Sequence, residues 1–415
     1  MTQKIQAIRG MEDVLPDQSA LWERLEDACR DVFRQYGYRN IRVPLVEQTA
    51  LFVRGIGDAT DIVEKEMYVF EDRNGESLAL RPEATAGIVR SAIEHNFLYN
   101  GPMRVWTTGP MFRYERPQKG RQRQFHQFDV EALGFDGPDV DAEQIVLLAR
   151  LWKRLGIADV ELQVNSIGDA AERKAHREKL IAYFEGHASI LDEDAKRRLH
   201  TNPLRILDSK NPAMQAMIEG APRLTEVLGE GARAHFEGLK SLLADAGISF
   251  TVNPRLVRGL DYYNRTVFEF VSGSIGAQST IAGGGRYDAL FEQLGGKPTP
   301  ACGFAFGVER VLLAMQAAGA SAEAEVDVFL VHSGEAAQRE AWRLAEQWRD
   351  KGRNVVLGAG GSFKSQMKKA DASGARYAVI LGDAEVQEKK VTIKPLREGG
   401  EQRTLEPGEA LALVE

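Results

Sequence analysis

Residues 111–131, MFRYERPQKGRQRQFHQFDVE, place carboxylates and cations on what the pattern predicts to be two strands joined by a polar loop. Because strand side chains alternate between two faces, the second strand has one apolar face and one polar face. The polar face carries Gln127, Asp129 and Glu131. Such a face could bind a charged ligand on a rigid sheet, or it could simply meet water, and the hairpin alone leaves both alternatives open.

The first strand and the loop supply the cations. We expect Phe112 and Tyr114 on the apolar face of the first strand, which leaves Arg113 and Glu115 beside the carboxylates. The loop is mostly cationic and includes Arg121. Guanidinium groups can hold an oxyanion with two parallel hydrogen bonds, so the predicted chemistry is that of cations and carboxylates side by side on a rigid sheet.

Three further stretches put polar groups on predicted strands where packing alone would not require them. They are LRPEATA at 80–86, RGLDYYNRTVFEF at 258–270, and the glycine-rich and arginine-bearing segments within 282–315. The second and third of these stretches also have ordinary structural interpretations. Arg310 could pair with Glu309 at the surface, the two tyrosines of the second stretch could be core aromatics, and the glycines at 283–285 could admit a flat ligand or mark a bulge.

The bulk composition limits the class of protein. A chain of 415 residues is too long for one core, so we expect two or three domains. No segment approaches the roughly 18 apolar residues of a membrane helix, and the first residues lack the apolar core of a secretory signal, so we expect a cytoplasmic protein with no membrane association. Two cysteines, Cys29 and Cys302, cannot build a disulfide framework.

The net charge of -7 argues against a protein that coats nucleic acid by bulk charge. A local basic patch on an acidic body remains compatible with it. The cationic loop of the hairpin is the candidate for such a patch.

The elements that must position these residues form antiparallel pairs flanked by helices. We expect an amphipathic helix at 17–36, one strand over YRNIRVPLVEQ, a hairpin around Asn74-Gly75 and a helix beginning near Thr85. A helix at 139–155 and the strand VELQVNS follow. Residues 168–245 read as helix only and look like an insertion into a sheet. From 325 strands alternate with helices, which predicts a small, mostly parallel α/β domain.

Taken together, the four polar stretches resemble the class II aminoacyl-tRNA synthetases, and specifically the histidyl-tRNA synthetase family. YGYRNIRVPLVEQ, with Pro44, resembles the first class II motif, the hairpin resembles the second, and GFAFGVERVLL resembles the third. RGLDYYNRT resembles a peptide peculiar to the histidyl enzymes. The resemblance covers essentially the whole chain. It implies an α+β catalytic domain over 1–324, interrupted by the helical insertion at about 168–245, and an α/β anticodon-binding domain over 325–415.

The resemblance implies a ligase that converts L-histidine and ATP to histidyl-adenylate with release of pyrophosphate, and then transfers histidine to the 3' end of tRNA(His). ATP is then a substrate used with Mg2+, and no metal bound by the protein alone is expected. The implied partners are L-histidine, ATP, tRNA(His) and a second copy of the chain in a homodimer.

Activation joins a carboxylate to the α-phosphorus of ATP, so the site must supply cations. The resemblance implies that Arg113 holds the α-phosphate, Arg310 the distal phosphate of a bent ATP, and that Arg258 acts where other class II enzymes place a magnesium ion. The ATP site would further include Arg121, Gly283 and Gly285. Besides Arg113 and Arg258, the implied histidine-binding residues are Glu83, Ala84, Thr85, Gln127, Glu131, Tyr262 and Tyr263.

Two positions depart from the pattern usual in the family. Ala84 stands where glycine is usual and adds a methyl group, and Asp129 stands where a small residue is common and adds a negative charge on the face of Glu131. We expect both to affect affinity rather than function.

The rival interpretation is a non-catalytic histidine-binding paralogue that regulates the first enzyme of histidine biosynthesis. Such proteins typically lack the anticodon domain and lose the ATP-binding arginines. This chain keeps Arg113, Arg258 and Arg310, and an α/β domain is predicted after residue 325, so the sequence favours the catalytic interpretation.

Overall fold

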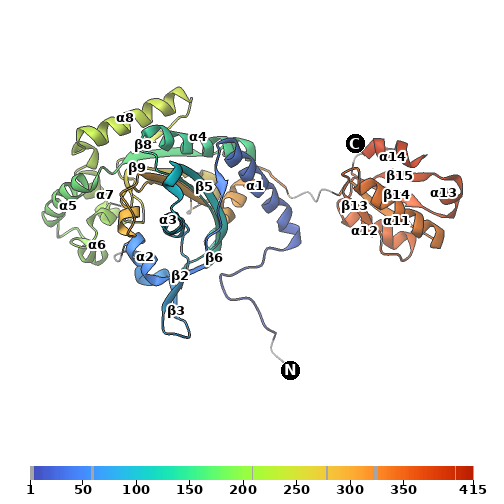
Figure 1. Cartoon of the computed structure of the whole chain (residues 1–415), viewed down its shortest axis with the longest axis horizontal. Coiled ribbons are helices and arrows are strands. Elements are labelled where there is room, and N and C mark those ends of the chain that lie inside the picture. The colour runs from blue at the N-terminus through green and yellow to red at the C-terminus, as the bar shows by residue number, and fades with distance from the viewer. Residues whose placement is uncertain are drawn as a thin grey trace. The chain divides into compact units, whose positions relative to one another are not determined.

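A computed structural model of the chain describes residues 4–57, 60–207, 209–276, 279–321, 326–397 and 399–414. The chain divides into two compact units, one formed mainly by residues up to Ala320 and one mainly by residues from Ser321 onward (Figure 1). Within the described ranges, no helix has both the length and the apolar character needed to cross a membrane.

The first unit is built on a large sheet with the strand order β1-β5-β6-β11-β10-β9-β7-β8. Its inner strands pair antiparallel, whereas the short edge strands β1 and β8 pair parallel with their neighbours. This confirms the predicted α+β class with an antiparallel sheet. The strands are β1 (Arg39–Asn40), β5 (Met103–Phe112), β6 (Gln124–Leu133), β7 (Glu161–Ser166), β8 (Thr251–Val252), β9 (Asn264–Val271), β10 (Thr280–Arg286) and β11 (Ala301–Gly307).

Strand β6 has the two faces that its alternation predicts. On the apolar face Phe128 stacks on Phe306 of β11 with ring centroids 5.2 Å apart, and Val130 is fully buried. The polar face is buried as well, because Asp129 and Glu131 are each only 1% exposed. The face therefore does not meet bulk water, and its polar groups must be satisfied by protein or by a ligand.

The first strand of that hairpin is shorter than predicted. Strand β5 ends at Phe112, and the amide of Tyr114 donates to the Glu66 carbonyl at 2.6 Å instead of joining the sheet. Tyr114 is 54% exposed. The Arg123 guanidinium lies over the Tyr114 ring, with its central carbon 3.9 Å from the ring centroid. The prediction that Tyr114 belongs to the apolar face is wrong, because the chain has left the strand before this residue.

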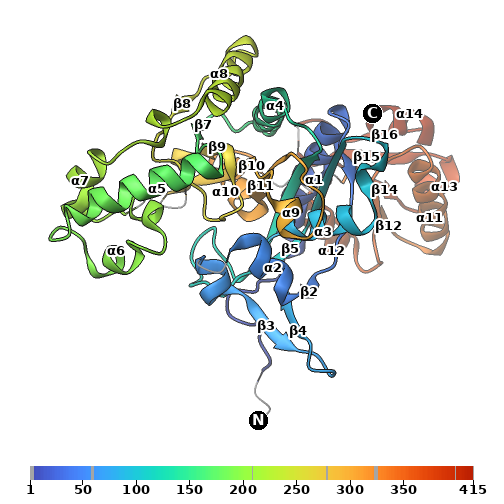
Figure 2. The same cartoon turned by 60° about the vertical axis from the view of Figure 1, so that its left-hand side comes forward.

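Helices cover the sheet at positions close to those predicted. Figures 1 and 2 show α4 and α8 side by side, and α1 carries Phe33 against Trp106 of β5 at 5.3 Å between centroids. The helices of this part are α1 (Pro16–Gln35), α2 (Thr49–Ile56), η1 (Ile62–Glu66), α3 (Thr85–Glu94), η2 (Phe97–Asn100), α4 (Pro138–Leu155), α8 (Glu230–Asp245), η6 (Gly273–Ile275), α9 (Leu290–Gln293) and α10 (Val308–Ala317).

A second, three-stranded sheet corrects one prediction. The segment predicted as a single strand across Pro44 forms two short strands in different sheets, because β1 pairs with β5 whereas β2 (Val46–Gln48) pairs with β4 (Ser77–Leu80). Strand β3 (Tyr68–Glu71) completes this sheet. The predicted turn at Asn74-Gly75 is confirmed, and Gly75 has the positive φ of 82° that such a turn favours.

The predicted helical insertion is confirmed for the described residues between 168 and 245, which contain helices and no strand. Its core is formed by apolar residues that include Leu180, Phe184 and Met214, and Figure 2 shows α5, α6 and α7 grouped together. The elements are α5 (Ala170–Glu185), α6 (Glu193–Arg198), η3 (Pro203–Ile206), η4 (Pro212–Met214), α7 (Gln215–Glu219) and η5 (Leu224–Glu226), followed by α8.

The second unit is an α/β domain with the strand order β13-β12-β14-β15-β16. Its first three strands are parallel, but β15 and β16 return antiparallel. The predicted mostly parallel sheet is therefore correct only for β12, β13 and β14. The elements are β12 (Val328–His332), α11 (Glu335–Arg349), β13 (Val355–Leu357), α12 (Phe363–Ala372), β14 (Tyr377–Leu381), α13 (Asp383–Glu388), β15 (Val391–Pro395), β16 (Arg403–Leu405) and α14 (Pro407–Val414).

Candidate active site

One cavity of about 340 Å³ lies in the first unit and gathers most of the predicted site residues. Its walls come from β6, β10 and β11, from the start of α3, from the loop before β9 and from the start of α10. The predicted residues that line it are Glu83, Thr85, Arg113, Arg121, Gln127, Glu131, Arg258, Tyr262, Tyr263, Gly283 and Arg310.

Two predicted site residues, Ala84 and Gly285, do not line this cavity. The Ala84 side chain is fully buried in an apolar cluster that includes Ile88 and Val105. Gly285 lies where β10 bulges against β9, and a Cβ there would sit 2.3 Å from the Thr266 carbonyl oxygen. Glycine at this position therefore serves the close approach of two strands, one of the alternatives that the sequence left open.

The start of α3 holds one carboxylate of the cavity. Glu83 accepts hydrogen bonds from the backbone amides of Thr85 at 2.8 Å and Ala86 at 2.9 Å. Burial raises the pKa of Glu83, and these helix amides oppose the shift. Glu83 was expected on a strand, but β4 ends at Leu80, so Glu83 lies in the turn that enters α3, whose predicted start near Thr85 is confirmed.

A second carboxylate, Glu131, is fixed from two sides. It accepts hydrogen bonds from the Thr85 hydroxyl at 2.7 Å and from the Tyr287 hydroxyl at 2.5 Å. A Cβ at Gly303 on the neighbouring strand would lie 1.5 Å from a Glu131 carboxylate oxygen, so only glycine leaves room for this side chain. Burial raises the pKa of Glu131 well above its ordinary value. Tyr287 was missed by the sequence reasoning.

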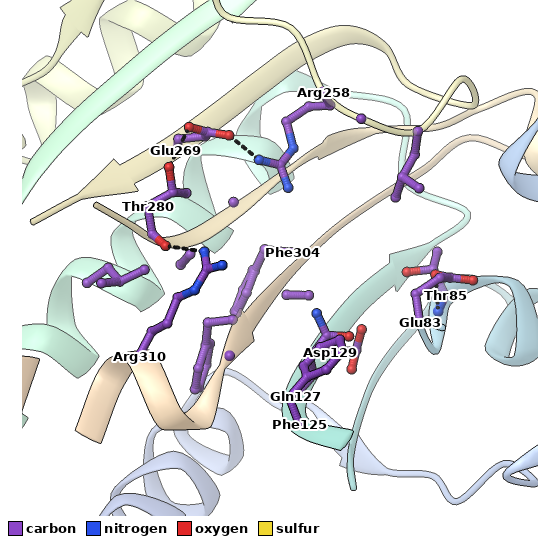
Figure 3. Close-up of a pocket in the computed structure, with 18 of the residues that line it drawn as sticks. Glu83, Thr85, Phe125, Gln127, Asp129, Arg258, Glu269, Thr280, Phe304 and Arg310 are labelled. Carbon is purple, nitrogen blue, oxygen red and sulfur yellow. Dashed lines mark hydrogen bonds and ion pairs between the residues drawn. The ribbon is translucent and has the colours of Figure 1, made fainter. Parts of the chain in front are cut away.

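The third carboxylate, Asp129, differs from the other two. Neither of its oxygens has a hydrogen-bond partner of regular geometry among the described residues, and the same holds for Oε1 of Gln127 two residues earlier on β6. Burial, and next the Glu83 carboxylate, raise the pKa of Asp129 to about 7, although Arg81, Arg113 and the Ala84 amide lower it. Figure 3 shows Gln127 and Asp129 together on the strand.

Arg258 is anchored above the opposite side of the cavity (Figure 3). Its guanidinium pairs with Glu269 of β9 and lies 5.8 Å from the Tyr263 ring centroid. A Cβ at Gly283 would approach this guanidinium to 2.6 Å, which explains a glycine there without a ligand. Arg258, Tyr262 and Tyr263 were expected on a strand, but they lie in the loop before β9, which begins at Asn264.

Glu269 was also missed. The sequence could have indicated its importance, because a glutamate inside the apolar run VFEFV of a predicted strand requires a polar or charged partner. Glu269 accepts from Thr280 at 3.0 Å as well as from Arg258. It therefore links the arginine to β10.

Three arginines form the cationic side of the site. Arg310, in the first turn of α10, donates to the carbonyls of Gly120 at 3.0 Å and Thr280 at 2.9 Å, and Arg113 donates to that of Pro82 at 2.9 Å. Arg121 pairs with Glu115. Burial and then the nearby Arg121 guanidinium lower the pKa of Arg310, with a further contribution from Arg113. Mutual repulsion of this kind favours binding of an anion among the three.

The cavity thus has an acidic side, where Figure 3 shows Glu83 and Asp129, and a cationic side, where it shows Arg258 and Arg310. Glu131 also lines the cavity. An amino acid could place its ammonium at the acidic side and its carboxylate toward the cationic side, where a polyphosphate could also lie. A site of this kind on an antiparallel sheet, with an arginine at the start of a following helix, has the organisation of a class II aminoacyl-tRNA synthetase.

Comparison with known proteins identifies the family. Residues 10–311 match the family "Histidyl-tRNA synthetase" and residues 325–415 match "Anticodon binding domain". The chain is 62% identical over 414 residues to a histidine--tRNA ligase of Methylobacillus flagellatus, with 99% of both chains covered, and 63% identical over 398 residues to that of Bordetella avium, with 95% and 93% covered. The chain belongs to the histidyl-tRNA synthetase family.

The fold comparison agrees. The apo histidyl-tRNA synthetase of S. aureus superposes with a TM-score of 0.81 at 36% sequence identity, covering 99% of this chain and 100% of that one. The helical insertion and the C-terminal α/β domain are thus included in the likeness.

Proposed function

We propose that the chain is a histidine--tRNA ligase whose active site is the cavity between β6, β10, β11 and the loop before β9. The observation that carries this proposal is the convergence of Glu83, Gln127 and Glu131 with Arg113, Arg258 and Arg310 in one cavity. Relatives about 60% identical over nearly the full chain bear the same activity in their names.

In the first step, a carboxylate oxygen of histidine attacks the α-phosphorus of ATP, a P–O bond forms, and the bond to the pyrophosphate leaving group breaks. Arg113 and Arg258 would stabilise the charge on the substrate carboxylate and the α-phosphate, and Arg310 with Arg121 would hold the distal phosphates. Glu131 and the neighbouring tyrosines would pair with the imidazole, so that side chains without matching nitrogens leave buried groups unpaired.

The proposed reaction uses Mg2+ that binds together with the substrate ATP. No group of three His, Cys, Asp or Glu side chains within the described ranges could hold a metal by itself. Mg2+ in nucleotide sites is usually held by one or two carboxylates together with the phosphates. Glu115 and Glu269 line the cavity and offer such carboxylates, which fits an ion that arrives with ATP.

In the second step, a terminal ribose hydroxyl of tRNA attacks the activated carbonyl and AMP leaves. The second unit matches a family named for anticodon binding, which supports tRNA(His) as the acceptor. The same domain, together with the retained arginines, speaks against the regulatory paralogue, because that class typically lacks both.

The decisive test is exchange of labelled pyrophosphate into ATP. We expect exchange that requires histidine, because only a bound histidine carboxylate can open the α-phosphate bond reversibly. The other amino acids should each give no exchange above background. Folded protein that shows no histidine-dependent exchange would contradict the proposed activity and favour the regulatory alternative.

The proposed assembly is a homodimer, the commonest closed arrangement of identical chains. Large apolar side chains are exposed around the small sheet, including Leu45, Val46 and Phe70, and clustered exposed apolar groups are typical of interaction surfaces. We expect light scattering to give the mass of two chains at micromolar concentration.

Replacing Leu45 and Val46 together with aspartate should shift that mass toward one chain, because two buried charges would oppose association. The matched control is Trp342→Asp, which changes another exposed apolar residue, located in the second unit. A monomeric wild-type protein, or equal dissociation by the control, would contradict this interface.

A further inference from the structure

We propose that Asp129 is an additional binding residue for the α-ammonium group of the amino-acid substrate and contributes to selection of that group. The inference rests on the proposed function and deepens it. Asp129 occupies a position where the family usually has a small residue, so the usual pattern of site residues does not assign it a role.

The hydrogen bonds of the three carboxylates distinguish Asp129. Glu83 already accepts from two backbone amides, and Glu131 from the Thr85 and Tyr287 hydroxyls. Within the part of the chain that the structure describes, both oxygens of Asp129 lack a hydrogen-bond partner of regular geometry, although the side chain is only 1% exposed. A buried acceptor without a donor is costly, so this arrangement is best explained by a donor that arrives with the ligand.

The neighbouring arginine side chains do not act as this missing donor. Arg81 directs its guanidinium to the carbonyls of Pro110 at 3.0 Å and Val43 at 3.2 Å, and Arg113 donates to the Pro82 carbonyl. Asp129 forms no ion pair with either arginine, and burial opposes its ionisation in the free protein. The acceptor capacity of Asp129 is therefore available on the cavity side.

Strand β6 brings the acceptor atoms of Gln127 and Asp129 to the same part of the cavity. Gln127 and Asp129 are two residues apart and share a face of the strand, and both line the cavity beside Glu83 and Thr85 (Figure 3). An ammonium group has three donors. The carboxylate of Asp129 and Oε1 of Gln127 can accept two of them, and a positive charge at this point offsets the repulsion between Asp129 and Glu83.

The same placement links binding to pH. The charged groups that face Asp129 are Glu83, Glu131, Arg81 and Arg113, together with the Ala84 amide. Binding of an ammonium favours the ionised carboxylate, so histidine should release a proton from Asp129 when the free side chain is partly protonated. Affinity should then fall as the pH drops through about 7, in addition to any effect of the substrate's own imidazole.

The test compares dissociation constants of histidine and of its des-amino analogue, 3-(imidazol-4-yl)propionate, measured by calorimetry at pH 8 with the full-length protein. Wild-type protein should prefer histidine. Asp129→Asn should reduce this preference about 10- to 100-fold, as expected for loss of a charged hydrogen bond, while affinity for the analogue changes little. Asp129→Ser provides a second variant with a smaller side chain, and the exposed Asp136→Asn is the matched control.

A second measurement follows the pH dependence of histidine affinity between pH 6 and 8. The part of this pH dependence that wild-type protein shows and Asp129→Asn lacks is assigned to Asp129, because Glu83, Glu131 and the substrate imidazole are present in both proteins. Equal weakening of histidine and analogue, or an unchanged preference in both variants, would overturn the role of Asp129. Wild-type protein that binds neither ligand would instead overturn the proposed function.

Discussion

Replacing Arg258 with alanine is expected to lower the rate of adenylate formation by about a hundredfold to a thousandfold, as for loss of one preorganised donor at a developing charge. The histidine dissociation constant should change by a much smaller factor. We expect this difference because the loop before β9 holds Arg258 beside the cavity, where Glu269 and Tyr263 fix its guanidinium. Negative charge at the α-phosphate grows only as the pyrophosphate bond weakens, so the interaction strengthens in the transition state.

Single-turnover adenylate formation at saturating ATP and calorimetric titration with histidine separate the two effects. Arg258→Lys should recover only part of the rate, because an ammonium lacks the planar fork of the guanidinium. Arg255→Ala is the matched control from the same loop, where the side chain forms a partly exposed ion pair with Glu219 at 3.2 Å. If Arg258→Ala weakens histidine binding as much as it slows the reaction, Arg258 is a substrate anchor and the proposed catalytic role is wrong.

Local patterns predicted the elements well where they depend on neighbours in sequence. The helix over 17–36 was expected from its apolar spacing and appears as Pro16–Gln35, and the turn at Asn74-Gly75 follows from the conformational freedom of glycine. The segment across Pro44 failed because tertiary pairing divides it between two sheets. Strand propensity cannot report which partner a strand will find.

In the site, too, local sequence patterns predicted which residues share a face but not which distant residues contact them. Alternation on β6 predicted that Gln127, Asp129 and Glu131 share a face, and the structure confirms this placement. Alternation could not predict that this face is buried, nor that Tyr287, 156 residues further along the chain, donates to Glu131. Which carboxylate lacks a donor of regular geometry among the described residues depends on contacts between distant segments, so the difference between Asp129 and the other two carboxylates became visible only in the fold.

Replacing Arg286 with methionine is expected to destabilise the catalytic unit by about 3–5 kcal/mol, because it leaves a buried carboxylate without its cation. Arg286 is fully buried and donates to Asp141 at 2.7 Å, to the carbonyl of Gly137 at 3.0 Å and to Asp288 at 3.0 Å. Asp141 also contacts Nε2 of His235 on α8 at 2.8 Å. The network therefore joins β10, α4 and α8. Hydrogen-exchange protection of the β10 amides reports the free energy of opening at this point.

The ion pair of Arg286 with Asp141 also makes the stability of the fold depend on pH in the acid range. Burial alone would raise the pKa of Asp141, but the His235 hydrogen bond and the Arg286 charge outweigh it and lower the pKa to about 2. Because the folded-state pKa lies below the unfolded value of about 3.9, the stabilisation is fully present above about pH 4 and is lost as the pH falls toward 2.

Two variants distinguish a buried network from ordinary packing. The exposed pair of Arg30 with Glu26 provides the control, since Arg30→Ala should cost less than about 1 kcal/mol. Replacing Arg286 with methionine and Asp141 with leucine together should recover much of the lost protection, because the unpaired charge is then removed as well. Failure of the double variant to exceed the single one would mean that the cavity left by the arginine, rather than the stranded carboxylate, accounts for the loss.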